Sequence, residues 1–260
     1  MSSPPQGDHA VSGERKPGAQ TSTGASVPLA GRGTYRHGDL REALLTAGVE
    51  MARHGGPDAV VLREATRRAG VTPNAAYRHF ADRGALLRAV SDVAQGLAAD
   101  AMEREVEAAA ARSAGAGSAA EGRAGGAFAG ASPGGTTVDG ADEARLMLRA
   151  VGTGYLGFAR DEPGLFRAAF SVPDHLDNSG DGAKAGAGGR TPFQILGAAL
   201  DLWAAAGILP PERRANAELF AWSAVHGLGM LVIDGPLRGL NAQMVDGATV
   251  RVLDMVERGL

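Results

Sequence analysis

The residues of this sequence that are best suited to chemistry fall in one short stretch, AGVTPNAAYRHF, at positions 69–80. Thr72 can cap a helix and Pro73 suits the first helical position, so the stretch predicts a turn followed by a short helix. Asn74 and Arg78 are four residues apart and would share one face of that helix. An asparagine amide can bind adenine through two hydrogen bonds, and an arginine can bind O6 and N7 of guanine. The pair is therefore suited to base edges in the major groove of DNA.

The neighbours of this pair set the orientation of the predicted helix. Ala76 and Phe80 occupy the opposite face with Val71, and we expect them to be buried. Tyr77 and His79 flank the outward face, where a hydroxyl and a ring N–H commonly contact phosphate oxygens. The same two side chains could instead close the small core, and a Tyr77→Ala substitution would separate the two roles.

The charge pattern favours a polyanionic partner. The chain has a formal net charge of −3 at pH 7, yet four arginines and one acid, Glu64, lie between Leu62 and Phe80. A basic excess confined to one segment is what a small DNA-contacting surface needs. A solvated helix face would have the same composition, so charge alone leaves both interpretations open.

Composition excludes several classes of protein. The 260 residues are 44% apolar and contain no cysteine, so a core can form but disulfides, thiol nucleophiles and cysteine metal sites cannot. The N-terminus lacks the apolar segment of a signal sequence, and the most apolar run is too short to span a membrane. The histidines have no metal-ligand spacing. We expect a cytoplasmic protein without a metal, cofactor or membrane partner.

Apolar residues recur at three- and four-residue spacing, which predicts an all-α protein of about nine helices. A disordered tail is expected at 1–33, a three-helix helix-turn-helix domain at 34–92, and a second helical domain at 93–260. Two Gly- and Ala-rich stretches near 111–140 and 177–190 are expected to be flexible insertions. Further helices are expected near 141–160, 162–171, 191–206, 211–232 and 242–258.

The stretches YRHGDLREALLTAG, LREATRRAGVTPNAAYRHF and ADRGALLRAV closely resemble the DNA-binding domain of the tetracycline-repressor (TetR) family over roughly residues 35–92. The resemblance implies a transcriptional regulator, usually a repressor, that binds a palindromic operator as a homodimer. It implies DNA contacts from a set of polar and helix-start residues: Arg36, Arg63, Thr72, Pro73, Asn74, Ala75, Tyr77, Arg78, His79 and Arg83.

Two positions depart from the family pattern. Val61 replaces the usual Ser or Thr cap of the second helix, a loss of about 0.5–2 kcal/mol. Ala65 and Thr66 replace a customary Ile-Ala pair, which thins the packing under the motif.

The stretch FAWSAVHG, at 220–227, has the Trp-x-x-x-His-Gly spacing of a C-terminal domain named for those residues, and it resembles that WHG-type domain. Trp222 and His226 share one helix face, where each ring can be buried while an N–H finds a partner. His226 can be a core histidine or a ligand-sensing one. In the family the last two helices pair with those of a second subunit, so we expect an apolar stripe of the last helix (Val245, Val252, Leu253 and Val256) to do the same.

A pocket for a small hydrophobic or amphipathic effector is expected in the second domain. Its predicted lining is Tyr155, Phe158, Phe166, Phe170, Trp203, Trp222 and His226, residues that would equally form an ordinary core. An effector that binds the DNA-free form better than the DNA-bound form would release the operator.

Two enzyme-like patterns fail on their context. GTGYLG at 152–157 matches a dinucleotide fingerprint, but a helical stretch precedes it and no βαβ unit follows. Ser223 and His226 lack the elbow of a serine hydrolase. We therefore expect no catalytic residues and no enzyme. The remaining alternative is a DNA-binding architectural protein without an effector, which would not prefer one palindrome over random DNA.

Overall fold

The protein consists of helices and their connections throughout the part that is described. A computed structural model describes residues 37–124 and 140–260, and within these ranges there are ten α-helices and no strand. The all-α prediction is confirmed. The helices are α1 (His37–Gly55), α2 (Leu62–Arg68), α3 (Pro73–Ala76), α4 (Arg83–Ala124), α5 (Gly140–Asp161), α6 (Pro163–Ala169), α7 (Pro192–Ala205), α8 (Pro211–Arg214), α9 (Ala217–Ile233) and α10 (Ala242–Gly259).

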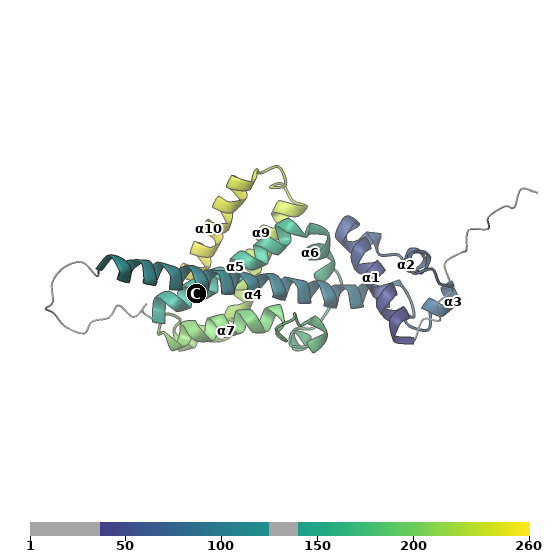
Figure 1. The fold of residues 1–260 in the computed structure, drawn as a ribbon, viewed down its shortest axis with the longest axis horizontal. Helices are drawn as coiled ribbons and strands as arrows, with labels where there is room; N and C mark the ends of the chain where they lie inside the picture. The colour runs from purple at the N-terminus through teal and green to yellow at the C-terminus, as the bar shows by residue number, and fades with distance from the viewer. Residues whose placement is uncertain (1–36, 125–139) are drawn as a thin grey trace, which may run out of the picture. The chain divides into compact units, whose positions relative to one another are not determined.

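The first three helices pack around a small apolar core at the start of α4 (Figure 1). Every one of these helices contributes buried side chains, because each has apolar residues at helical spacing. The buried side chains include Leu44, Met51, Leu62, Ala65, Ala76, Phe80, Leu86 and Val90. The small residues Ala65 and Ala76 are fully buried, which lets α2 and α3 lie close to α1.

The turn between α2 and α3 is fixed by Gly70, which has a φ of 67°. Glycine adopts this left-handed conformation without strain. The N–H of Gly70 donates to the carbonyl of Arg67 (3.2 Å) and the N–H of Val71 donates to that of Thr66 (3.0 Å). This pair of bonds is the Schellman motif, which ends α2 and sets the direction of α3.

The helix α3 is shorter than the sequence predicts. It ends at Ala76, and residues 77–79 form a turn. Thr72 stands at the N-cap position, but its side chain makes no capping hydrogen bond, so the predicted cap is wrong. Val61, as expected, provides no side-chain cap for α2. This segment is therefore held in place by the burial of Ala76 and Phe80, and not by a side-chain cap.

The helix α4 links the N-terminal helices to the rest of the chain. The Asp82 carboxylate accepts a hydrogen bond from the N–H of Ala85 (2.7 Å) at its start. The flexible insertion expected near 111–140 is wrong in its first part, because residues 111–124 continue α4. Alanine is the strongest helix former, and the alanines of this stretch outweigh its glycines. The remainder, 125–139, lies outside the described residues.

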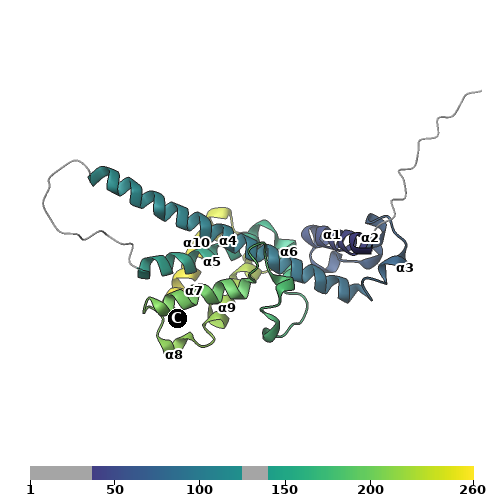
Figure 2. The same cartoon turned by 60° about the horizontal axis from the view of Figure 1, so that its bottom comes forward.

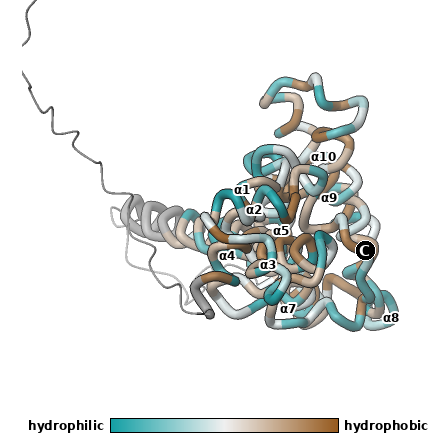
Figure 3. The backbone as a smooth tube through the Cα atoms, turned by 90° about the vertical axis from the view of Figure 1, so that its right-hand side faces the viewer, coloured by the Kyte–Doolittle hydropathy of each residue, from teal (hydrophilic) through white to brown (hydrophobic). Residues whose placement is uncertain are grey.

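Close helix packing explains the glycines of α5. A Cβ atom at Gly152 would lie 2.4 Å from Leu253 Cδ2 of α10, and one at Gly154 would lie 2.7 Å from the carbonyl oxygen of Ala101 in α4. These glycines therefore let α5 approach both helices. The GTGYLG stretch lies inside a helix, which agrees with the rejection of a dinucleotide site. Hydrophobic stretches of α5 and α9 lie toward the middle of the surrounding helices (Figure 3).

The connection between α6 and α7 is an ordered loop. It contains two 3-10 helices, η2 (Leu176–Asn178) and η3 (Gly182–Lys184). The N–H of Ala187 donates to Asp100 Oδ1 of α4 (2.6 Å), and Arg190 forms an ion pair with Glu103 of α4 (3.0 Å). The flexible insertion expected at 177–190 is therefore wrong, because backbone and ionic contacts hold this stretch against α4.

The helix expected at 211–232 is broken into α8 and α9. Asn216, between them, has a φ of 61°, a conformation that interrupts a right-handed helix. The short α8 lies beside the end of α7 (Figure 2). The stripe predicted on the last helix is also corrected in part: Leu253 and Val256 are buried within this chain, while Met244, Val250 and Met255 of α10 are exposed.

The tail expected at 1–33 lies outside the described residues, as does Arg36. No helix in the described ranges combines the length and the apolar character that crossing a membrane requires.

Candidate nucleic-acid interface and ligand cavity

The polar residues predicted to read DNA point away from the small N-terminal core. Asn74 and Arg78 are exposed, whereas Ala76 and Phe80 are buried. Tyr77 is 57% exposed, so its ring does not close the core as the alternative interpretation requires. The predicted division between inward and outward residues thus holds, although the helix itself is shorter.

Ion pairs divide the arginines of this region into two kinds. Arg67 donates two hydrogen bonds to the Glu64 carboxylate (2.7 and 2.8 Å), and Arg68 donates one (2.8 Å). These hydrogen bonds lower the pKa of Glu64 to about 2, and those from Arg67 contribute more than the one from Arg68. Arg63 and Arg78 are exposed and have no ion pair within the described part of the chain. The uncompensated positive charge of this surface therefore resides on Arg63 and Arg78.

Arg83 has a structural role that sequence inspection missed. Its Nε donates to the carbonyl of Val60 and its Nη2 to that of Pro57, both at 2.7 Å. These bonds tie the start of α4 to the 3-10 helix η1 (Pro57–Ala59). A phosphate contact at this position would have to share the guanidinium with both carbonyls.

The other predicted contacts differ in exposure. Thr72 and Pro73 are exposed, and Ala75 and His79 are half-buried. Arg36 precedes the described residues, so its position is not part of the surface defined here. We name the exposed set Arg63, Thr72, Pro73, Asn74, Tyr77 and Arg78 the polar face.

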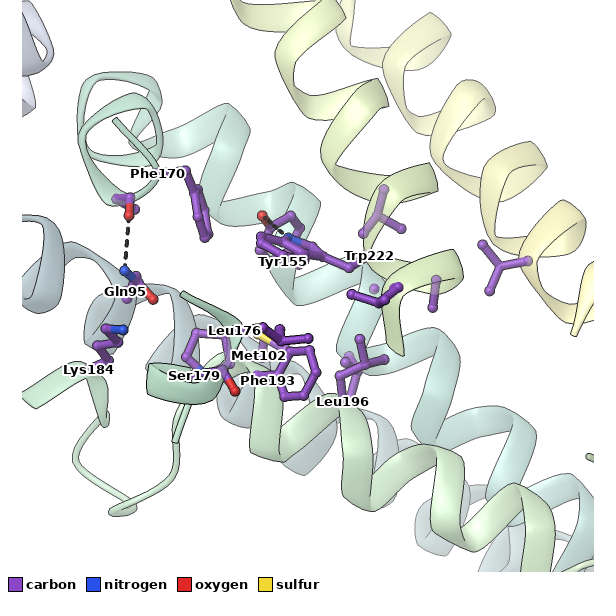
Figure 4. A pocket seen from close by; sticks show the side chains of 18 of the residues that line it. Gln95, Met102, Tyr155, Phe170, Leu176, Ser179, Lys184, Phe193, Leu196 and Trp222 are labelled. Atoms are coloured by element: carbon purple, nitrogen blue, oxygen red, sulfur yellow. Dashed lines mark hydrogen bonds between the residues drawn. The ribbon is translucent and has the colours of Figure 1, made fainter. Parts of the chain in front are cut away.

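A cavity of about 460 Å³ lies among α4, α5, α7, α9, α10 and the loop after α6. This volume is in the range of small-molecule sites. Figure 4 shows Phe170, Phe193, Leu196 and Trp222 around the cavity. Most of the remaining wall is also apolar: Met102, Leu148, Val151, Leu176, Val225 and Leu253.

Three of the seven predicted pocket residues, Tyr155, Phe170 and Trp222, line this cavity. Phe158, Phe166 and Trp203 do not line it and are buried elsewhere in the core. Trp203 Nε1 donates to the carbonyl of Ala144 (2.9 Å), and this bond satisfies the indole within the core. Helical periodicity identified these residues as inward-facing but could not tell core from cavity wall.

His226 is also absent from the cavity wall, and hydrogen bonds explain its position. Trp222 Nε1 donates to the Tyr155 hydroxyl (2.9 Å), which lies 2.9 Å from His226 Nδ1. The phenol can therefore accept from the indole and donate to the imidazole. The His226 ring also stacks on Phe166 at a centroid distance of 5.3 Å. Burial lowers the pKa of His226. The lowered pKa favours the neutral ring, which can accept the hydrogen bond from Tyr155.

This chain of hydrogen bonds gives a physical meaning to the Trp-x-x-x-His spacing. Four residues along α9 bring both rings to one hydroxyl of α5, so the motif joins two helices behind the cavity. His226 is half-buried and its Nδ1 has a partner within the protein, as expected for the first of the two roles considered for it, and the ligand-sensing role stays a prediction.

The polar part of the cavity wall was not predicted. It includes Gln95 of α4, Arg149 of α5, Ser179 and Lys184 of the loop, and Glu257 of α10. These residues come from segments far apart in the chain and belong to no motif, so the sequence offers no signal that joins them.

The helix α6 connects the cavity with the N-terminal helices (Figure 1). At its start, Arg53 of α1 forms an ion pair with Glu162 (3.0 Å), and a Cβ at Gly164 would lie 2.3 Å from the carbonyl oxygens of Ala52 and Arg53. At its other end, Ala169 and Phe170 line the cavity. The carbonyl of Ala169 also accepts bonds from Ser91 (2.7 Å) and Gln95 (3.0 Å) of α4.

A helix-turn-helix unit with an exposed polar face, followed by a larger helical region, defines the class of DNA-binding transcriptional regulators. Residues 44–90 match the family described as bacterial regulatory proteins, tetR family, and residues 148–256 match the one described as Tetracyclin repressor-like, C-terminal domain. The chain belongs to the TetR family, whose members are DNA-binding regulators. The more specific WHG-type assignment remains a prediction.

A solved structure, described as that of a protein with unknown function from Rhodococcus sp. RHA1, is similar to this chain. The two are 25% identical with a TM-score of 0.54, and the match covers 87% of this chain and 98% of the other. No curated protein matches the sequence. Within the described ranges, no group of three or more His, Cys, Asp or Glu side chains is arranged to hold a metal ion.

Proposed function

We propose that this protein is a cytoplasmic repressor that binds a palindromic operator as a homodimer and releases it when a small hydrophobic or amphipathic molecule enters the cavity. The observation that carries the DNA-binding part is the polar face. Asn74 and Arg78 are exposed there beside Tyr77, and Arg78 has no carboxylate partner among the described residues. These groups match the hydrogen-bonding pattern of base edges and phosphates.

Exposed apolar side chains on the last two helices support the dimer. Phe220 (71% exposed) and Leu231 (43%) are eleven residues apart on α9 and thus share one face. Met244 (53% exposed) and Met255 (58%) have the same spacing on α10. Large apolar groups in such rows indicate a protein contact. A second copy of the chain would bury them and place two polar faces about 34–36 Å apart on DNA, one helical turn.

The position of α6 supports release by an effector. A ligand in the cavity would touch Phe170 and Ala169 at one end of this helix, while the other end is packed on the backbone of α1. Displacement of α6 would therefore move the N-terminal helices. The ligand must bind the displaced form more tightly than the DNA-bound form, because only differential affinity shifts the equilibrium. The presence of the cavity favours this regulator over an architectural DNA-binding protein.

Selection of bound sites from random duplex DNA tests the proposal directly. The full chain is expected to enrich one palindrome and to bind it about 10³-fold or more tightly than random DNA at physiological salt. An architectural protein would enrich no palindrome. A folded protein that stays monomeric and binds no duplex even at low salt would defeat the proposed function.

A further inference from the structure

The Lys and Arg side chains of the cavity wall are already paired with carboxylates of the protein itself. The side chain of Lys184 is 5% exposed, forms an ion pair with Asp174, and donates to the carbonyl of Asn178 (2.7 Å). Arg149 Nη1 lies 2.8 Å from Asp254 and 3.0 Å from Glu257, so two carboxylates share one guanidinium. Every Lys and Arg of the described wall thus has a carboxylate partner.

Further carboxyl groups lie near Lys184. Burial raises the pKa of nearby Asp92, and the charges of Asp181 and Asp174 raise it further, whereas Lys184 and Arg88 lower it. The exposed His175 also belongs to the wall here. An anion that entered would find no unpaired Lys or Arg in the described wall, and burial of an uncompensated charge is costly.

Uncharged hydrogen-bonding groups are, in contrast, available. Gln95 uses its Nε2 to donate to the carbonyl of Ala169 (3.0 Å), and its amide oxygen accepts no bond within the described residues (Figure 4). The Ser179 hydroxyl likewise makes no hydrogen bond there. In Figure 4 Gln95 and Lys184 lie on one side of the cavity, and Leu196 and Trp222 lie on the other. Uncharged hydrogen-bonding groups and apolar side chains thus face each other across the cavity, and the ion-paired Arg149 and Glu257 are further members of its wall.

We propose that the cavity selects an uncharged amphipathic molecule and rejects an anionic one of the same size. Its apolar body packs against Phe193, Leu196 and Trp222, and its hydroxyl or amide head group bonds to Gln95 and Ser179. The assignment rests on the proposed effector-responsive function and adds the chemical class of the effector.

Three probes with the same ten-carbon chain test the preference: decanol, decanamide and decanoate. Binding to the full chain is measured by calorimetry at neutral pH and below the aggregation limit of each probe. Decanol and decanamide are expected to bind at least about tenfold more tightly than decanoate, a difference of about 1.4 kcal/mol. Equal or tighter binding of decanoate overturns the inference, and so does failure of both uncharged probes to bind.

A change of charge at the wall sharpens the test. Asp174→Asn leaves Lys184 without its carboxylate, so the affinity for decanoate should rise about tenfold while that for decanol stays unchanged. Asp142→Asn is the matched control, because Asp142 pairs with Arg145 outside the cavity wall. An unchanged affinity for decanoate in folded Asp174→Asn protein contradicts the inference.

If Asp174→Asn does not fold, a milder variant still tests the proposed ligand class. Ser179→Ala removes one hydroxyl at a half-buried position and should weaken decanol binding about fivefold. Unchanged decanol binding in this variant overturns the head-group assignment. Operator binding by the ligand-free parent is measured in parallel, and its absence would count against the proposed regulator and not against the ligand class.

Discussion

The N-terminal helices and the cavity region use similar residues in opposite ways. Around α3 the polar side chains point outward, and small residues such as Ala65 and Ala76 fill the core beneath them. In the cavity region the aromatic and polar groups point inward, toward Tyr155 or toward the cavity. The difference teaches that substitutions on the polar face should change DNA affinity without changing stability, whereas those in the cavity region should change stability, assembly or coupling.

The largest expected effect concerns assembly. Leu231→Asp places a charge on the exposed α9 row and should weaken the dimer by about 2–4 kcal/mol, the effect of a central interface residue. Light scattering after gel filtration measures the mass at micromolar protein concentration. Leu202→Asp is the matched control, because Leu202 is 45% exposed on α7 and Leu231 is 43% exposed. Equal masses for both variants would remove the support for this dimer surface.

The second effect concerns the polar face. Arg78→Ala should cost about 1–3 kcal/mol of operator binding and leave the melting temperature unchanged, because Arg78 is exposed and has no ion pair among the described residues. Fluorescence anisotropy with a labelled operator measures the loss. Arg67→Ala, which removes an arginine already paired with Glu64, should lose much less. If Arg78→Ala unfolds the protein, the claim that polar-face residues affect DNA affinity and not stability is wrong.

The third effect tests the connection between the regions. A methyl group at Gly164 would clash with the backbone of α1, so Gly164→Ala should lower the free energy of unfolding by about 1–3 kcal/mol and shift α6. Gly157→Ala is the control in α5, since a Cβ there meets nothing within 4 Å, and it should stabilise the helix by about 1 kcal/mol. Denaturant titration measures both. Equal stabilities would mean that α6 is not tightly seated on α1.

The two regions also differ in how far the sequence predicts them. The turn at Gly70, the burial of Phe80 and the exposure of Asn74 follow from contacts within a few residues, and local patterns encode such contacts. The cavity wall joins positions as distant as Gln95 and Glu257, so it depends on the packing of whole helices. Periodicity could mark both Phe166 and Phe170 as inward-facing. It could not show that Phe170 lines the cavity whereas Phe166 lies in the core.

Errors in the predicted elements have the same origin. Glycine-rich composition suggested flexibility at 177–190, but the contacts of Arg190 and Ala187 with α4 are long-range and hold the loop in place. Arg83 likewise has a structural role, because it donates hydrogen bonds to carbonyls more than twenty positions earlier in the chain. Long-range hydrogen bonds of this kind leave no periodic signal in a sequence.

The smallest effect is a dependence of stability on pH that should belong to the cavity region. Burial lowers the pKa of His226, so the folded protein binds a proton at this ring less readily than the unfolded chain, whose histidine has a pKa of about 6.5. As the pH falls below that value, the unfolded state takes up more protons and the free energy of unfolding decreases. For one histidine the slope is at most about 1.4 kcal/mol per pH unit.

Replacement of His226 should remove its contribution to the pH dependence of the free energy of unfolding. His226→Gln keeps an acceptor for the Tyr155 hydroxyl but cannot be protonated, so its stability should fall less than that of the parent between neutral and mildly acidic pH. Urea titrations of both proteins across this range give the two slopes. Parallel slopes would show that His226 does not stay neutral in the fold, and the chain of bonds from Trp222 through Tyr155 would then need another acceptor.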